Sequence, residues 1–319
     1  MKVRWGLAEL PGLLDELGSK RPFLVASPRW EPPVEVVGRW SEVPSDRIDE
    51  AAQATEGADA LLALGGGSAI DLAKAISVET GLQVVSVPTT YSGAEWTPSF
   101  GVRDLDRKRR GGGSGADLAG IVYDPELTVG LPRAETVGTS MNALAHAAEA
   151  LYVEGRNPEG DQEALAGAAL ISEWLPRVVE HPDDLEARRR LLEGAMHAGA
   201  ALASAGLGLG HALAQTIGGR YGLPHGTMNA LSLPQALRFN NPVAGEEIAR
   251  FGEAMGTDDP IGRVEELARL GEFGRLRDYG VPEDDLMAIA EASGVRPGAG
   301  ANPRPATPAA IVELLRAMW

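Results

Sequence analysis

Short apolar runs alternate with helical patterns over roughly the first 130 residues of the chain. The runs are FLVA at 23–26, ALLAL at 60–64, VVSV at 84–87 and IVY at 121–123, each apolar along almost its whole length. Strands that are covered by helices on both faces have this pattern, which is typical of a parallel sheet built from βαβ units. The first part of the chain is therefore predicted to be an open α/β domain.

Beyond the turn at Gly130, Leu131 and Pro132 the strand signal fades and the pattern becomes helical. We place the domain boundary near residue 132, which gives an α/β domain with a parallel sheet at 1–132 and an all-α domain at 133–319. Breaks at Pro, Gly and Asn separate the predicted helical stretches, which are 137–153, 162–179, 185–205, 248–251, 261–270, 284–292 and 309–318.

Composition narrows the possible partners. The chain carries 29 Lys and Arg against 45 Asp and Glu, a net charge of −16. Because an acidic surface repels phosphate backbones and anionic headgroups, we expect neither nucleic acid nor membrane as a partner. The absence of cysteine rules out disulfides, thiolate nucleophiles and Cys-ligated zinc. No stretch approaches the roughly 18 apolar residues of a membrane span and no leader-like segment is evident, so we expect a cytoplasmic protein.

A glycine-rich turn follows the second apolar run. Gly65, Gly66, Gly67 and Ser68 lie between that run and a helical pattern. Backbone N–H groups at such a helix N-terminus point outward, and without Cβ atoms a pyrophosphate can approach them closely. The same residues are also compatible with a simple strand-to-helix turn, and they match neither the GxGxxG fingerprint nor a Walker P-loop.

The third apolar run ends in a row of hydroxyl groups, PTTYSG at 88–93. Open parallel sheets bind ligands at the carboxyl ends of their strands, where Thr89 and Thr90 are expected to lie. Serine and threonine are also ordinary turn residues. Two phosphate-compatible loops at one edge of the sheet nevertheless favour a nucleotide ligand.

Histidines gather in the helical half. Asn142 and His146 are four residues apart in a helical pattern, so they share one face. His211 and Gln215 repeat this spacing in a glycine-rich helix, and His225 follows a Leu-Pro turn. Three histidines and one amide oxygen could bind zinc or ferrous iron, although without the charge that a carboxylate or thiolate supplies. The alternative is that they are hydrogen-bonded core or surface residues. His181 and His197 lie in polar or amphipathic stretches without a partner at useful spacing, and we interpret them as structural.

Five motifs, in order along nearly the whole chain, resemble the iron-containing alcohol dehydrogenase superfamily and most closely its maleylacetate reductases. The resemblance implies an N-terminal domain at 1–132 that binds NAD(P)H, a helical domain at 133–319 that holds the substrate and metal site, and a homodimer. The motifs are GGGSAIDLAKA from Gly65, PTTYSGAEWTP from Pro88, YDPELTVGLP from Tyr123, MNALAHAAEALY from Met141 and GLPHGTMNALSLPQALRFN from Gly222.

The resemblance also implies roles for single residues in the cofactor site. It assigns Gly66, Gly67 and Ser68 to the cofactor pyrophosphate. It assigns Thr89, Thr90 and Thr97 to the rest of the cofactor. Lys108 matches a lysine that reaches the cofactor ribose, although by itself it looks like part of a solvated basic run, RDLDRKRR.

The superfamily metal ligands are Asp, His, His and His. By position they fall on Asn142, His146, His211 and His225. The change from Asp to Asn at the first position resembles the maleylacetate reductases, many of which work without metal. The resemblance therefore implies a possible iron or zinc ion whose presence Asn142 puts in question.

Two positions depart from the superfamily pattern. Gln215 stands where a second histidine is common, and a glutamine cannot shuttle a proton near neutral pH. The first apolar run is followed by Ser27, Pro28 and Arg29, so no acidic side chain is present there to hold the adenosine ribose. A 2′-phosphate is then not repelled, and Arg29 could attract it, so we expect NADPH to be accepted as well as NADH.

The leading hypothesis is a maleylacetate reductase-like enzyme that transfers hydride from NAD(P)H to an activated C=C or C=O bond of a small oxo-acid. His146, His211 and His225 would stabilise the enolate charge, and cationic side chains would hold the carboxylates of this small anionic substrate. The main alternative is an iron- or zinc-dependent alcohol or polyol dehydrogenase with a carbonyl substrate. A cyclase that resembles dehydroquinate synthase and a non-catalytic nucleotide-binding relative are the remaining alternatives.

Overall fold

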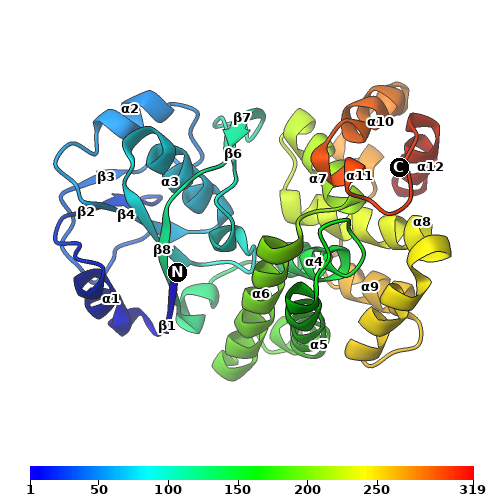
Figure 1. Ribbon diagram of the computed structural model, residues 1–319, viewed down its shortest axis with the longest axis horizontal. Coiled ribbons are helices and arrows are strands. Elements are labelled where there is room, and N and C mark those ends of the chain that lie inside the picture. Colours follow the sequence, from blue (N-terminus) through cyan, green and yellow to red (C-terminus); the bar gives the residue numbers. More distant parts are fainter. The chain divides into compact units, whose positions relative to one another are not determined.

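The computed structural model describes residues 1–319, and Figure 1 shows its helices and strands. The chain divides into two units. The first unit comprises Met1–Thr90 and Ala94–Gly130, and the second comprises Tyr91–Gly93 and Leu131–Trp319. A short segment of three residues in the first half of the sequence thus packs with the helices of the second half.

A six-stranded sheet, with all strands parallel, forms the centre of the first unit. The four strands predicted from apolar runs are confirmed, and they are the four inner strands. The two edge strands were not predicted, because their residues are only partly buried and form no apolar run. In spatial order the strands are β1 (Lys2–Trp5), β8 (Leu118–Tyr123), β5 (Gln83–Pro88), β4 (Ala60–Gly65), β2 (Pro22–Val25) and β3 (Gly38–Trp40).

Helices cover both faces of this sheet, namely α1 (Leu10–Glu16), α2 (Ile48–Gln53) and α3 (Gly67–Thr80). Leu62 and Leu64 of β4 belong to the core that contains α1. Leu61 and Ala63 belong to the opposite core, with α2 and α3. Burial on both faces explains why the inner strands read as uninterrupted apolar runs. Short 3₁₀ helices complete the unit at η1 (Leu7–Glu9), η2 (Ala94–Trp96) and η3 (Pro125–Thr128).

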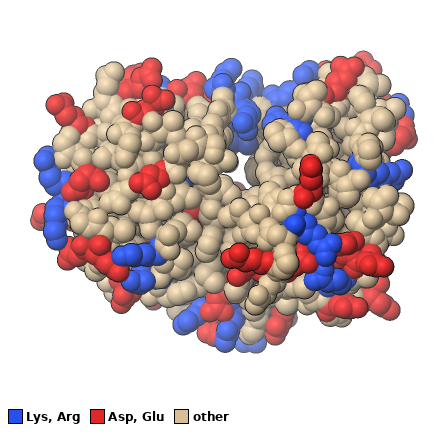
Figure 2. Space-filling view, viewed as in Figure 1, with Lys and Arg blue, Asp and Glu red and all other residues tan.

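A separate antiparallel hairpin, which was not predicted, consists of β6 (Phe100–Arg103) and β7 (Arg109–Gly113). A Cβ atom on Gly112 would lie 2.6 Å from the carbonyl oxygen of Phe100, so the glycine-rich strand allows a close backbone contact. Glycine is depleted in strands, which hid β7 from the sequence pattern. Lys108 lies in the turn, and basic side chains gather over the hairpin (Figure 2).

The second unit is all-α, as predicted. Its helices α7 (Leu209–Tyr221), α8 (His225–Ala254), α10 (Leu286–Gly294) and α12 (Pro308–Met318) share one hydrophobic core. None of the helices is both long and apolar enough to serve as a membrane span. The helices are α4 (Arg133–Ala150), α5 (Pro158–Glu180), α6 (Leu185–Ala205), α7 (Leu209–Tyr221), α8 (His225–Ala254), α9 (Pro260–Arg269), α10 (Leu286–Gly294), α11 (Pro297–Gly300) and α12 (Pro308–Met318), with 3₁₀ helices η4 (Leu276–Tyr279) and η5 (Glu283–Asp285).

Helix α8 is the largest departure from the predicted helices. Only residues 248–251 of it were expected, whereas the helix begins at His225. Pro234 and Pro242 lie inside it, and the backbone leaves helical geometry at Ala244. Proline normally ends or kinks a helix, so these two residues obscured a helix that tertiary packing maintains.

Candidate active site

The glycine-rich turn leads directly from strand β4 into helix α3. Gly66 is the N-cap of α3, and no side chain caps the first N–H groups of the helix. Gly66, Gly67 and Ser68 are partly exposed. A Cβ atom on Gly66 would lie 2.8 Å from Cγ2 of Thr90, so glycine allows the two loops to approach each other. This uncapped helix N-terminus is suited to a phosphate group.

The threonines predicted as cofactor contacts lie at the carboxyl end of strand β5. Gly65 at the end of β4 is the register partner of Pro88, and the N–H of Thr89 donates to the carbonyl of Gly65 at 3.0 Å. The Oγ1 atoms of Thr89 and Thr90 are buried without a hydrogen-bond partner. Buried hydroxyl groups are normally paired, so two orphaned ones beside an open helix N-terminus fit a bound nucleotide.

Two further residues assigned to the cofactor lie on segments that are anchored to α3. The carbonyl of Thr97 accepts a hydrogen bond from Nζ of Lys74, a buried lysine of α3, at 3.2 Å. Lys108 is exposed in the hairpin turn, and Asp71 of α3 accepts a hydrogen bond from the N–H of Gly101 in β6 at 3.1 Å. The hairpin that carries Lys108 is therefore attached to the helix whose N-terminus the glycines form.

The three predicted site histidines lie next to one another in the second unit. His146 is on α4, His211 is on α7, and His225 is the first residue of α8. The rings of His146 and His211 are stacked, with centroids 4.6 Å apart and planes 14° apart. The ring centroid of His225 lies 5.9 Å from that of His211. We call these residues, together with Asn142, the histidine cluster.

Two glycines place His225 beside α4. A Cβ atom on Gly226 would lie 2.4 Å from the carbonyl carbon of Gly138 and 2.5 Å from its oxygen. The backbones of α4 and α8 therefore touch at this point, and a larger residue at position 226 would separate the helices. The crossing fixes the first turn of α8, and with it His225, against the helix that carries His146.

Glu149 is a member of this site that the sequence analysis missed. It is on α4, fully buried, and its carboxylate accepts hydrogen bonds from the N–H of Gly208 at 2.6 Å and of His211 at 3.1 Å. Oε2 of Glu149 also lies 2.7 Å from Nδ1 of His211, which fixes a ring proton on Nδ1. The available signal was the spacing of Asn142, His146 and Glu149, which share one face of α4.

Asn229 was also missed. Its Nδ2 atom donates to Oδ1 of Asn142 at 2.7 Å and lies 3.1 Å from Nε2 of His225. Nε2 of His211 lies 3.3 Å from the same oxygen of Asn142. Asn229 is four residues after His225 on α8, so the four-residue spacing of His and Asn on α4 occurs a second time. The two asparagines join the three elements of the cluster.

The segment Tyr91–Gly93 packs into the histidine cluster. The carbonyl of Ser92 accepts a hydrogen bond from Nδ2 of Asn142 at 2.7 Å. A Cβ atom on Gly93, whose φ is +71°, would lie 3.3 Å from Nδ1 of His146. The hydroxyl motif that follows β5 thus supplies threonines to the first unit and a backbone contact to the histidines of the second.

The pKa of His146 is strongly perturbed. Burial lowers its pKa well below the usual range, and the neighbouring His211 and His225 lower the pKa further. Nδ1 of His146 is buried without a hydrogen-bond partner. The ring is therefore neutral at pH 7 and offers one donor and one acceptor.

Of the four positions that the resemblance assigns to a metal, Asn142 and His211 contact each other through Oδ1 and Nε2, His225 reaches Asn142 through Asn229, and His146 stacks on His211. Oδ1 of Asn142 accepts from Asn229, and no carboxylate is among the four. A zinc site needs donors at about 2.0–2.2 Å around one point, and no three His, Asp or Glu side chains of the chain are arranged to hold a metal. The amide of Asn229 would have to move before a cation could bind, so we derive no chemical step through a metal.

The two remaining histidines lie outside the cluster. Nδ1 of His197 lies 2.6 Å from Oε2 of Glu163 on the neighbouring helix α5, a partner that sequence spacing did not indicate. His181 is exposed and lies 4.0 Å from Glu180. The structural role of these two residues stays a prediction.

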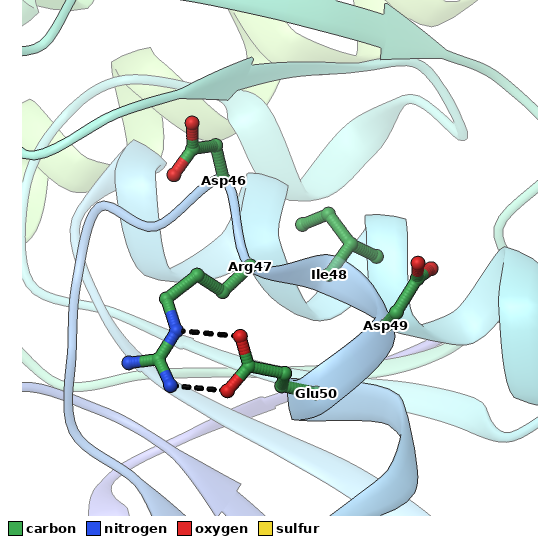
Figure 3. Close-up of a pocket in the computed structure, with 5 residues that line it drawn as sticks. All are labelled: Asp46, Arg47, Ile48, Asp49 and Glu50. Atoms are coloured by element: carbon green, nitrogen blue, oxygen red, sulfur yellow. Dashed lines mark hydrogen bonds and ion pairs between the residues drawn. The ribbon is translucent and has the colours of Figure 1, made fainter.

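A pocket of about 380 Å³ lies at the start of α2 and contains none of the predicted site residues. Figure 3 shows that Arg47 points toward Glu50, and Nε of Arg47 donates to Oε1 of Glu50 at 2.8 Å. The guanidinium of Arg47 is thus already paired with Glu50, and we assign no function to this pocket. The lining residues form one continuous stretch, Asp46, Arg47, Ile48, Asp49 and Glu50.

The parallel sheet, the open glycine turn, the orphaned threonines and the histidine cluster together define a class of enzyme. The family model for iron-containing alcohol dehydrogenases matches residues 4–119, and that for the C-terminal part of the Fe-containing alcohol dehydrogenase family matches residues 136–319. The chain belongs to the iron-containing alcohol dehydrogenase family. It is an oxidoreductase that uses a nicotinamide cofactor.

Individual relatives narrow the comparison. The chain is 34% identical over 334 aligned positions to the maleylacetate reductase of Pseudomonas sp. (strain P51), covering 99% of this chain and 94% of that protein. It is 38% identical over 260 positions to the maleylacetate reductase of Burkholderia cepacia, covering 81% and 73% respectively. The crystal structure of maleylacetate reductase from Agrobacterium tumefaciens superimposes with a TM-score of 0.88 at 31% identity, covering 100% of this chain and 95% of that one.

Proposed function

We propose that this protein reduces maleylacetate or a closely similar small oxo-acid with NADH or NADPH. The observation that carries the proposal is the histidine cluster, in which His211 and His225 contact a pair of neutral amides, Asn142 and Asn229, and His146 stacks on His211. Reduction of a C=C bond conjugated with a carbonyl group places negative charge on an enolate oxygen. Neutral N–H donors can stabilise that delocalised charge without a Lewis acid. The relatives named above support the choice of substrate.

We propose that the first unit binds the cofactor, which supplies the hydride when bound. The uncapped N-terminus of α3 would hold the pyrophosphate, and the orphaned hydroxyls would complete their hydrogen bonds with the rest of the cofactor. The exposed Lys108 would reach a ribose from the hairpin. The remaining residues proposed as contacts are Gly66, Gly67, Ser68, Thr89, Thr90 and Thr97.

The second unit would act on the substrate. Glu149 holds the ring of His211 in one orientation, with Nδ1 protonated and Nε2 facing the cluster. His146, which is neutral, and His225 would each donate one ring N–H to the substrate oxygen. Because these rings are already packed in place, little reorganisation is needed when the charge develops.

We propose that the enzyme accepts NADPH as well as NADH, because of the residues in the loop after β2. That loop carries no acidic side chain up to Arg29, which is exposed and lies over the ring of Trp30 at 5.0 Å. An exposed guanidinium can pair with a 2′-phosphate. The ratio of kcat/KM for the two cofactors measures this, and a variant Arg29→Gln should lose activity selectively with NADPH.

The direct test is to follow oxidation of NADH and NADPH with maleylacetate and with a panel of neutral aldehydes. We expect turnover with maleylacetate in protein that has been treated with a chelator and shown to contain no metal. Turnover of aldehydes alone, or only after addition of ferrous or zinc ion, would overturn the proposal.

One observation favours a second candidate, a metal-dependent alcohol dehydrogenase. A buried carboxylate that orients a histidine, as Glu149 orients His211, is common behind metal-ligating histidines. The same experiment separates the two candidates, because only the metal-dependent enzyme loses activity with the chelator. The cytoplasmic location and the homodimer stay predictions, and light scattering on the purified protein tests the second.

A further inference from the structure

Two polar residues of the glycine-rich motif, Asp71 and Lys74, have no part in the mechanism above. Both lie on α3, four and seven residues after Gly67, at which the helix begins, so they share one face of the helix. The side chain of Lys74 is only 1% exposed. Burial of an ammonium group is costly unless oxygen atoms surround it, so the surroundings of Lys74 show what it does.

Four oxygen atoms surround Nζ of Lys74. The carbonyl oxygens of Ala94, Thr97 and Ser99 accept from it at 2.8, 3.2 and 2.5 Å. Oδ1 of Asp71 lies 3.0 Å away and supplies the compensating charge. An ammonium group has three N–H donors, so these oxygens engage all of them within the protein. The ammonium group therefore holds the segment that carries the three carbonyls.

A second contact holds the same segment, residues 94–99, from strand β8. The hydroxyl of Tyr123 donates to Oε1 of the buried Glu95 at 2.6 Å and accepts from Nε1 of Trp96 at 2.8 Å. The segment is thus fixed by its carbonyls to α3 and by two side chains to β8. Thr97, the predicted cofactor contact, lies in this segment with its carbonyl held by Lys74 and its side chain partly exposed.

Helix α3 connects Lys74 to the proposed phosphate site. The uncapped N-terminus of the helix is at Gly67, and seven residues of α-helix span roughly 10 Å. The backbone hydrogen bonds of the helix keep this separation constant. One helix therefore carries both the residues proposed for the pyrophosphate and the group that holds the segment of Thr97.

We propose that Lys74 is a positioning residue that presents Thr97 to the cofactor by holding segment 94–99; this inference rests on the proposed function. Lys74 acts through Thr97 and does not itself touch the cofactor. Without the ammonium group, three carbonyls lose their common partner, and the segment has to be ordered whenever the cofactor binds. Fixing the backbone of one or two residues corresponds to roughly 10- to 100-fold in affinity.

The test is the variant Lys74→Met, which has a side chain of similar length and no N–H donor. Calorimetry measures Kd for NADH, which needs both α3 and Thr97. Phosphorus NMR measures Kd for inorganic pyrophosphate, which needs only the N-terminus of α3. We expect Kd for NADH to rise about 10- to 100-fold and Kd for pyrophosphate to stay within about threefold. Equal losses for both ligands, or an unchanged Kd for NADH, would overturn the inference.

Two further measurements separate positioning from a purely structural role. Amide hydrogen exchange in segment 94–99 should be faster in Lys74→Met than in the wild type, and saturating NADH should restore the slower rate. Because the bound cofactor orders the segment, KM for NADH should rise while kcat at saturating NADH changes by less than about threefold. Unchanged exchange, or a fall in kcat at unchanged KM, would contradict the proposal.

The matched control is Lys20→Met. Lys20 pairs with Asp15 in the same unit, both side chains are exposed, and the substitution changes the net charge by the same amount. We expect Kd for both ligands to match that of the wild type. A loss of NADH affinity in this control equal to that in Lys74→Met would show that the effect follows from net charge, against the proposal.

The variant Lys74→Arg covers the case in which Lys74→Met fails to fold. It keeps a positive charge beside Asp71, but a planar guanidinium cannot direct its donors as a compact ammonium group does. Kd for NADH should rise by about 3- to 10-fold with pyrophosphate unchanged, and equal losses or no loss would contradict the inference. A wild type that binds neither NADH nor NADPH would show that the proposed function is wrong, whereas a failure confined to the variants would count against Lys74 alone.

Discussion

The substitution Glu149→Gln tests the part of the site that sequence motifs did not reveal. The glutamine has the same size, but it replaces a charged acceptor with one oxygen and one NH₂ group. Glu149 accepts from Gly208 and from Nδ1 of His211 at one oxygen and from the backbone N–H of His211 at the other. In either orientation of the amide, at least one buried donor then faces another donor.

The structure allows the cost to be worked out. An unpaired buried donor costs about 1–3 kcal/mol, and each retained bond loses a charge assistance of about 1 kcal/mol. The free energy of unfolding should therefore fall by about 3–5 kcal/mol, in the range for breaking a buried ion pair. At about 2–4 °C per kcal/mol for a unit of this size, Tm should fall by roughly 6–20 °C.

The assays are thermal unfolding followed by circular dichroism and steady-state kinetics below the unfolding transition. We expect kcat/KM to fall at least about tenfold, because His211 loses the group that fixes its tautomer. The control is Glu163→Gln, which removes a similar Glu–His pair with His197 that is about one-third exposed, and its cost should stay below about 1 kcal/mol. Equal Tm values for the two variants would refute the reasoning.

Two further substitutions follow from buried contacts. Gly226→Ala should lower the free energy of unfolding by about 1–3 kcal/mol and reduce activity, since the new methyl group meets the backbone of Gly138; Gly300→Ala, in open space, should do neither. Glu95 is fully buried, and burial raises its pKa despite the hydrogen bond from Tyr123 and the charge of Lys74, which lower it. The folded state thus holds its proton to higher pH than the unfolded state, so stability falls as pH rises above the unfolded pKa. Urea titrations of Glu95→Gln from pH 5 to 8 should show a shallower decline, and parallel curves would contradict this.

The sequence predicted the fold where burial is complete on both sides of an element. Inner strands such as β4 are buried on both faces and read as apolar runs. Edge strands β1 and β3 and the basic hairpin are partly exposed, so their residues carry no comparable pattern. Helix α8 was obscured by its two prolines, which the packing against α4 and α7 tolerates.

The sequence predicted which histidine and asparagine side chains form the candidate site, but it did not predict the hydrogen bonds between them. Spacing put Asn142 and His146 on one helix face, but nothing local shows that Glu149 reaches across to His211. Such a contact joins residues 62 positions apart, and only the packing of α4 against the start of α7 creates it.

The segment Tyr91–Gly93 determines where this chain can be divided into fragments. A fragment that begins at Leu131 would contain every helix of the second unit yet lack the carbonyl of Ser92 on Asn142 and the Tyr91 hydroxyl on the buried Arg188. Severing the chain at its obvious boundary would thus leave an amide and a guanidinium in the interior without those bonds. The second unit therefore includes a segment from the first half of the sequence. A hybrid that takes its C-terminal half from a relative must also take this tripeptide from that relative.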